Sequence, residues 1–169
     1  FDGFLFNNEF DLLELRLHEL APAVTAIILV EATFTFQNDA KPLYFEEYVA
    51  AHPARFAPWM DRIEHIKIDG RPHSADEAEV SALRARAKGN PWAIEVFCRD
   101  AIAKRGIPLM RAKHNAAPGD LIMITDVRSC DAGGARESAR ARERERERGG
   151  EGGCRAHPPA DVASRRCCR

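Results

Sequence analysis

Hydrophobic and polar residues follow two different spacings along the first 127 residues of the chain. Largely apolar runs predict strands at residues 4–6, 25–30 and 120–125, and an imperfect alternation of apolar and polar residues predicts a fourth at 63–68. Apolar residues three or four positions apart predict a helix at 10–20 and two helices within 75–105. The run at 25–30 is rich in β-branched residues, which is typical of a parallel strand covered on both faces. The order of elements therefore predicts an α/β fold with an open, mostly parallel sheet.

The connections between these elements carry their own local signals. Asn8 precedes the first helix and is predicted to cap it, by accepting a hydrogen bond from the backbone N–H of Asp11. Residues 33–48 are predicted to be a loop rich in aromatic side chains. The sequence Gly89-Asn90-Pro91 divides the later helical stretch in two. The second of these helices, at about 92–104, brings Trp92, Glu95 and Arg99 to one side.

Polar residues follow each predicted strand. They are Asn7, Asn8 and Glu9 after the first strand, Glu31 after the second, Asp69 after the third and Asp126 after the fourth. The carboxyl ends of parallel strands meet at one edge of a sheet, so these residues are expected to converge on a ligand. A divalent cation that bridges an acid to phosphates would suit them, because hard cations prefer oxygen ligands.

Each of these polar residues also has a purely structural interpretation. Acids at strand ends often cap a helix or solvate a turn, and Asp69-Gly70 is favoured as an ordinary turn pair. Glu31 and Asp126 follow buried runs and have fewer local reasons to be acidic. Arg99 is either a surface partner of Glu95, four residues earlier, or a cation directed at phosphate.

Several function classes are disfavoured by what the chain lacks. No Gly-x-Gly-x-x-Gly loop, Walker loop or Gly-x-Ser-x-Gly elbow follows a predicted strand. The net charge of −1 does not indicate a nucleic-acid partner. The most apolar stretch, residues 24–30, is far shorter than the roughly 20 residues of a membrane helix. The chain reads as an excised fragment, so we expect any targeting or anchoring segment to lie upstream of Phe1.

The composition changes abruptly at residue 128. Residues 128–169 consist largely of Arg, Glu, Gly, Ala and Cys, and include the repeat Arg-Glu-Arg-Glu-Arg-Glu-Arg at 142–148. With almost no large apolar residues, this tail is predicted to be disordered. A second hypothesis is translation in a shifted reading frame, because shifted G+C-rich codons yield these residue types. The predicted division is a folded domain at 1–127 and a low-complexity tail at 128–169.

Residues 1–127 carry a series of short motifs in the order and spacing of a known family. They include Trp92, Glu95 and Arg99 in a Trp-x-x-Glu-x-x-x-Arg helix, the stretch 120–127, and matching positions within 2–20, 30–31, 35–36 and 41–45. Together they resemble glycosyltransferase family 17. The resemblance implies a GT-A-like, Rossmann-like nucleotide-sugar fold, of which residues 1–127 would be the donor-binding half.

The resemblance also implies a function. Members of this family transfer N-acetylglucosamine from UDP-N-acetylglucosamine to the β-linked mannose of N-glycans on glycoproteins, a hexosyltransferase activity located on the lumenal side of the Golgi membrane. Mn²⁺ would bridge a carboxylate motif to the diphosphate, with Asp126 as its first acid. The residues that the resemblance assigns to the nucleotide sugar are Asn8, Glu9, Glu31, Arg99 and Asp126.

The chain departs from the family pattern directly after the last strand. The family continues Asp-Val-Asp-Glu-Ile-Pro, whereas Arg128 follows Asp126-Val127 here. A cation in this position would repel Mn²⁺ by several kcal/mol at an effective dielectric constant of about 20. The acceptor-binding half and its catalytic base are expected to be missing, so no catalytic residue is assigned and the activity is expected to be impaired. Phe34 is a smaller departure, at a position where a polar residue is expected. The alternative is a non-catalytic α/β binding or regulatory protein with a charged interaction tail.

Overall fold

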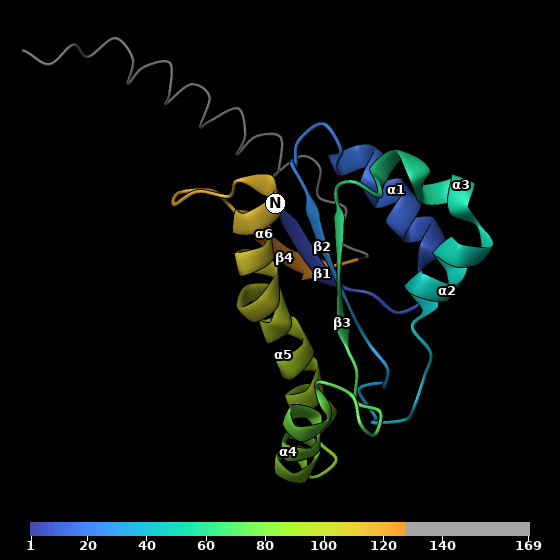
Figure 1. The fold of residues 1–169 in the computed structure, drawn as a ribbon, viewed down its shortest axis with the longest axis vertical. Helices are drawn as coiled ribbons and strands as arrows, with labels where there is room; N and C mark the ends of the chain where they lie inside the picture. The colour runs from blue at the N-terminus through green and yellow to red at the C-terminus, as the bar shows by residue number, and fades with distance from the viewer. Residues whose placement is uncertain (128–169) are drawn as a thin grey trace, which may run out of the picture.

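A computed structural model describes residues 1–127 of the chain, and within them the fold is a parallel sheet between two layers of helices (Figure 1). The sheet has four strands in the order β3-β2-β1-β4. Their bounds are β1 Asp2–Leu5, β2 Ile27–Ala32, β3 Ile63–Ile68 and β4 Met123–Asp126. All three neighbouring pairs are parallel, so all four carboxyl ends lie at the same edge. The prediction of an α/β fold with a parallel sheet is confirmed.

The helices divide between the two faces of the sheet (Figure 1). On one face lie α1 Phe10–Leu20, α2 Tyr44–Ala51, α3 Pro53–Phe56 and a 3₁₀ turn at Ala57–Trp59. On the other lie α4 Glu77–Ala87, α5 Pro91–Ala101, a π-helical turn at Ile102–Gly106 and α6 Ile107–His114. The last three form one continuous path that crosses the sheet. Gly106 permits the close approach, since a Cβ at this residue would lie 2.8 Å from the Ile28 side chain.

The core forms two layers that meet at the central strands. All six residues of β2 are buried, and their side chains alternate between the layers. Ile28 and Val30 pack with α4, α5 and α6, whereas Ile27 and Leu29 pack with α1, α2 and α3. A strand buried on both faces reads as a continuous apolar run, which is why the sequence signals it so clearly.

Two local predictions on the α1–α2 side are wrong. Asn8 does not cap α1: the N-cap residue is Glu9, and no side chain makes a capping hydrogen bond. The carboxylate of Glu9 instead accepts hydrogen bonds from the backbone N–H groups of Asn7 and Asn8. The predicted loop at 33–48 contains the start of α2, at Tyr44. This helix begins where the chain meets a carboxylate of β2, a contact that the local sequence does not reveal.

The strand bounds differ from the predictions at three places. β1 runs from Asp2 to Leu5, whereas residues 4–6 were predicted. β2 starts and ends two residues later than predicted, so Glu31 lies inside the strand and not beyond it. β4 is shorter than predicted and ends with Asp126. Within residues 1–127, β4 pairs with β1 alone and forms an edge of the sheet. The predicted strand at 63–68 has the observed bounds of β3, and the helix pair on both sides of Gly89-Asn90-Pro91 is also confirmed.

The predictions for residues 128–169, which concern disorder, a shifted frame and the domain boundary, lie outside the described residues. In the part of the chain that is described, no helix has both the length and the apolar character needed to cross a membrane.

Candidate functional site

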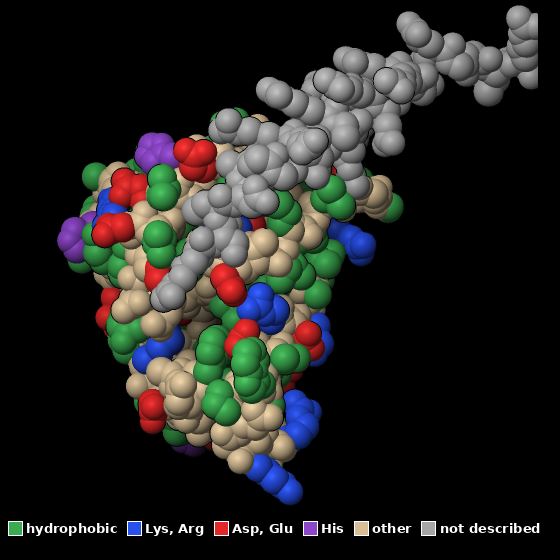
Figure 2. Space-filling model, turned by 180° about the vertical axis from the view of Figure 1, so that it is seen from behind, with side chains coloured by type: hydrophobic (Ala, Val, Ile, Leu, Met, Phe, Trp, Pro, Cys, Tyr) green, Lys and Arg blue, Asp and Glu red, His purple; other side chains and the backbone are tan. Residues whose placement is uncertain are grey.

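A cavity of about 580 Å³ opens at the carboxyl ends of β1, β2 and β4. It is lined by the strand ends, by the segment after β2 and by one side of α5. The lining residues with polar or charged side chains are Asn7, Glu9, Thr35, Gln37, Lys41, Glu95, Arg99 and Asp126. Aromatic and aliphatic side chains make up most of the rest. On the side opposite to Figure 1, hydrophobic side chains gather directly beside acidic and basic ones (Figure 2).

Arg99 joins two acids across the wall of this cavity. Its Nη2 donates to Glu95 Oε1 at 2.9 Å and to Asp126 Oδ1 at 3.0 Å. These hydrogen bonds, from Glu95 first and then Asp126, raise the pKa of Arg99 above its ordinary value. The pairing of Arg99 with Glu95 along α5 is confirmed, and Arg99 also reaches the end of β4. Its role as a cation directed at phosphate stays a prediction. A fixed cation between two carboxylates is thus part of the cavity wall.

Glu9 and Asn8 lie at the start of α1 but differ in placement. Glu9 lines the cavity, and its Oε2 atom is 3.1 Å from the backbone nitrogens of both Asn7 and Asn8. Asn8 is exposed and is not among the lining residues. The carboxylate of Glu9 therefore holds the turn after β1 in place while it faces the cavity.

Glu31 points away from the cavity, toward α2. Its side chain is fully buried, and its carboxylate accepts hydrogen bonds from the backbone N–H groups of Tyr44 at 2.6 Å and Phe45 at 3.2 Å. Lys41 Nζ lies 3.3 Å and His65 Nε2 3.1 Å from the same carboxylate. A carboxylate at a helix N-terminus satisfies free N–H groups and is stabilised by the helix dipole. Glu31 therefore anchors α2 to the sheet.

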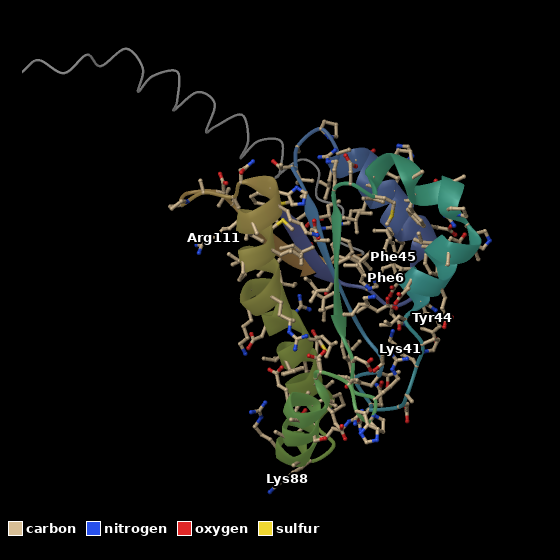
Figure 3. All side chains as sticks on the ribbon, viewed as in Figure 1. Phe6, Lys41, Tyr44, Phe45, Lys88 and Arg111 are labelled. Carbon is tan, nitrogen blue, oxygen red and sulfur yellow. The ribbon has the colours of Figure 1, made fainter. Side chains whose placement is uncertain are left out.

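The contacts of Glu31 also orient Lys41. Figure 3 shows Lys41 on the segment that leads into α2 and Tyr44 and Phe45 in the first turn of α2, with Phe45 near Phe6, the residue after β1. Lys41 is both a partner of Glu31 and a lining residue of the cavity. Glu31 thus acts on the cavity indirectly, by fixing the position of a cation.

A buried ion pair holds the carboxyl end of β4 in place. Arg16 of α1 donates to both carboxylate oxygens of Asp2, from Nε and from Nη2, each at 2.7 Å. It also donates to Thr125 Oγ1 at 2.5 Å and to the backbone carbonyl of Asp126 at 3.2 Å. The side chains of Arg16 and Asp2 are 1% and 0% exposed. One guanidinium thus links α1 and β1 to the residue that was predicted to bind a metal.

The ion pair between Arg16 and Asp2 was not predicted from the sequence, although the chain carries a signal for it. Arg16 lies three positions after Leu13 and four before Leu20, on the apolar face of α1, and it is buried together with Leu13, Leu17 and Leu20. A charged residue on the apolar face of a helix indicates a buried partner. This signal could have found Arg16, and Asp2 at the start of a buried strand is the acid that it pairs with.

The segment after β2 supplies cavity residues that the sequence analysis assigned only to a loop. Phe36 is 36% exposed at the cavity, whereas Phe34 is 2% exposed and packs in the core. The guanidinium of Arg84 lies 5.3 Å from the Phe34 ring, so this unexpected aromatic residue stabilises the fold. Cys98 also lines the cavity, but burial raises the pKa of its thiol to about 12. It therefore stays protonated and is a poor nucleophile.

The described residues do not by themselves fit a metal ion. Within residues 1–127, no group of three or more His, Cys, Asp or Glu side chains is arranged to hold one. Asp126 contributes a single carboxylate, which already pairs with Arg99. Glu9, Arg99 and Asp126 thus share the cavity, whereas Asn8 and Glu31 do not line it. That these residues bind a nucleotide sugar stays a prediction.

A parallel α/β domain with a ligand-sized cavity at the carboxyl edge of its sheet is a class that includes many small-molecule-binding enzymes. Sequence comparison identifies the family within this class to which the chain belongs. Residues 1–132 match glycosyltransferase family 17, and the chain belongs to this family.

The chain is also similar to curated proteins called beta-1,4-mannosyl-glycoprotein 4-beta-N-acetylglucosaminyltransferase. The human and rat proteins are each 26% identical to it over 120 residues, and the mouse protein is 25% identical over the same length. In each case the match covers 71% of this chain and 19% of the relative, so the chain spans about a fifth of these proteins. No solved structure matches the chain significantly.

Proposed function

We propose that the chain is the donor-binding part of a glycosyltransferase. In this proposal the intact enzyme transfers N-acetylglucosamine from UDP-N-acetylglucosamine to the β-linked mannose of N-glycans, and residues 1–127 form the first half of a GT-A-like fold. Family membership across residues 1–132 is the observation that carries the proposal. The names of the similar mammalian proteins support the sugar and the acceptor. They do not favour the alternative of a non-catalytic regulatory protein.

The cavity supports this assignment by its size and position. About 580 Å³ is within the range of small-molecule sites, and the cavity lies at the edge where parallel sheets bind ligands. Its lining includes two cations, Arg99 and Lys41, and three acids, Glu9, Glu95 and Asp126. A diphosphate brings further negative charge, so its binding depends on Arg99, on Lys41 or on an added cation.

Mn²⁺ dependence remains part of the proposal as an expectation from the family. Asp126 is the described residue that would contact the ion. Arg99 already donates to Oδ1 of this carboxylate, so Arg99 and Mn²⁺ would compete for the same oxygen atom. The described residues alone do not complete a site, so no step is assigned to the metal here. No catalytic base is assigned within residues 1–127.

The cellular location is likewise proposed from the family. We place the intact enzyme on the lumenal side of the Golgi membrane, where N-glycan acceptors are processed. Co-localisation of the tagged full-length protein with a Golgi marker would support this, and a purely cytosolic distribution would contradict it.

Isothermal titration calorimetry of the 169-residue chain with UDP-N-acetylglucosamine tests the donor-binding proposal. We expect saturable binding that Arg99→Gln weakens, because a charge-assisted hydrogen bond to phosphate is lost. Titrations with and without MnCl₂, repeated on Asp126→Asn, measure the contribution of the metal. Arg111→Gln on α6 is the matched control, since this exposed residue lies far from the cavity (Figure 3). No binding at millimolar donor, or equal loss in Arg111→Gln and Arg99→Gln, would contradict the proposal.

A further inference from the structure

Trp92 is the most exposed of the large hydrophobic side chains that the structure describes. Its relative exposure is 71%, although it lines the cavity at the first turn of α5. Asn90 caps this helix by accepting from the backbone N–H of Trp92 at 3.1 Å, which fixes the backbone that carries the indole. A large aromatic ring that is left exposed beside a cavity, on a backbone that is held in place, indicates a ligand surface.

A second aromatic ring lines the same cavity from a different element. Phe36, on the segment after β2, is 36% exposed. This segment is pinned at its base: Thr35 and Asp39 are joined by a backbone hydrogen bond of 2.8 Å, and the Thr35 hydroxyl accepts from the Asp39 N–H. The two rings therefore belong to elements whose backbones are fixed by hydrogen bonds, so little backbone entropy is lost when the rings bind a flat ligand.

The spacing along α5 links these rings to the charged end of the cavity. Trp92 and Arg99 are seven residues apart, which places them on the same helical face with a rise of about 10 Å between them. This separation is comparable to that between the base and the diphosphate of an extended nucleoside diphosphate. Both residues line the one cavity, so a single ligand can reach both.

We propose that Trp92, together with Phe36, stacks on the base of a nucleoside diphosphate whose phosphates reach Arg99. The inference rests on the proposed function and deepens it, by assigning the nucleoside to the outer, aromatic end of the cavity. Stacking suits the observations because a base offers a flat π-face to each ring without requiring hydrogen-bond readout. The indole acts as a binding residue and takes no part in the transfer chemistry.

Tryptophan fluorescence tests the placement, because the chain has two tryptophans and only one lines the cavity. Trp59 lies elsewhere, against the His18 ring, so Trp59→Phe leaves Trp92 as the reporter. We expect UDP to quench it saturably and uridine to quench it at higher concentration. Inorganic diphosphate and N-acetylglucosamine 1-phosphate should leave it unchanged. Quenching by N-acetylglucosamine 1-phosphate but not by uridine would assign the ring to the donor sugar and overturn the inference.

Calorimetry with UDP on ring variants completes the test. Trp92→Ala should weaken binding by roughly 5-fold to 100-fold, the range for one base stacked on an aromatic side chain. Trp92→Phe should restore most of the affinity. Val96→Ala is the matched control, because Val96 is 57% exposed one turn further along α5 and lies outside the lining. UDP binding that Trp92→Ala leaves unchanged overturns the stacking inference alone, whereas the absence of any nucleotide binding overturns the proposed function as well.

Discussion

The buried pair of Asp2 and Arg16 offers the sharpest test of how this fold is held together. Both side chains are almost fully buried, and two hydrogen bonds of 2.7 Å join them. Substituting Arg16→Met leaves the carboxylate of Asp2 without its partner in the interior. Loss of one partner of a buried pair costs about 3–5 kcal/mol, because the other charge stays desolvated and uncompensated. Ordinary domains have a free energy of unfolding of about 5–15 kcal/mol, so Arg16→Met should remove a large fraction of the stability of this domain.

The further contacts of Arg16 predict an order among the variants. Asp2→Asn keeps the shape and leaves Arg16 with Thr125 and the Asp126 carbonyl as acceptors, so it should cost less than Arg16→Met. The double variant should cost clearly less than the sum of the two single variants, because no charge is then buried alone. Urea unfolding at neutral pH gives the free energy of unfolding of each variant.

Lys104→Gln is the control for this series. It removes an ion pair with Asp100 whose side chains are 64% and 54% exposed, and such exposed pairs contribute little to stability. If Arg16→Met unfolds within about 1 kcal/mol of the unmodified chain, or the two single costs simply add, the buried pair does not stabilise the fold as argued.

Three further predictions concern single side chains. Hydrogen bonds from Arg71 hold the pKa of Asp69 at about 2, below its ordinary 3.8. The stabilisation that this carboxylate contributes is therefore complete above pH 3.8 and is lost as the pH falls toward 2. In Arg71→Ala, NMR titration should show an Asp69 pKa closer to 3.8, because the side-chain hydrogen bonds are lost while the backbone N–H of residue 71 still donates; an unchanged pKa would contradict this. Burial raises the pKa of the Cys98 thiol to about 12. In a variant whose cysteines after residue 127 are replaced by Ser, Cys98 should therefore resist iodoacetamide at pH 8 and react only after urea unfolds the protein; rapid labelling of the folded variant would contradict this. We expect the chain to self-associate through β4, the edge strand of the described sheet, where Ile124 is 45% exposed. Sedimentation velocity should therefore show less association in Ile124→Lys, and an unchanged distribution would rule out β4 as the contact.

The elements that could be predicted from sequence are those whose signals are local. β3 has three isoleucines within six residues before a turn, and the α4–α5 boundary is marked by Gly, Asn and Pro in succession. α2 was missed because its start depends on Glu31, thirteen residues earlier in the chain. β4 was predicted too long because an edge strand continues only as far as its single neighbour pairs with it.

The candidate site could be predicted only in part for the same reason. Apolar residues fill both faces of β2, so its sequence does not tell which layer Glu31 faces. Register and alternation place residues 27, 29 and 31 toward α1–α3, and Glu31 therefore meets α2 and not the cavity. Arg99 and Asp126 were expected at one edge, and the structure brings them to 3.0 Å. The aromatic end of the cavity depends on the path of the segment after β2, which no periodic pattern specifies.

The most direct test of the donor-binding claim is an NMR titration of the ¹⁵N-labelled 169-residue chain with UDP-N-acetylglucosamine. We predict that shift changes concentrate at the cavity, in the Trp92 indole, the backbone of Phe36 and the N–H groups of Asn7, Arg99 and Asp126. The amides of α1 and α3 on the other layer should stay unchanged. Shift changes confined to those helices, or none at saturating donor, would contradict the claim that this edge of the sheet binds the nucleotide sugar.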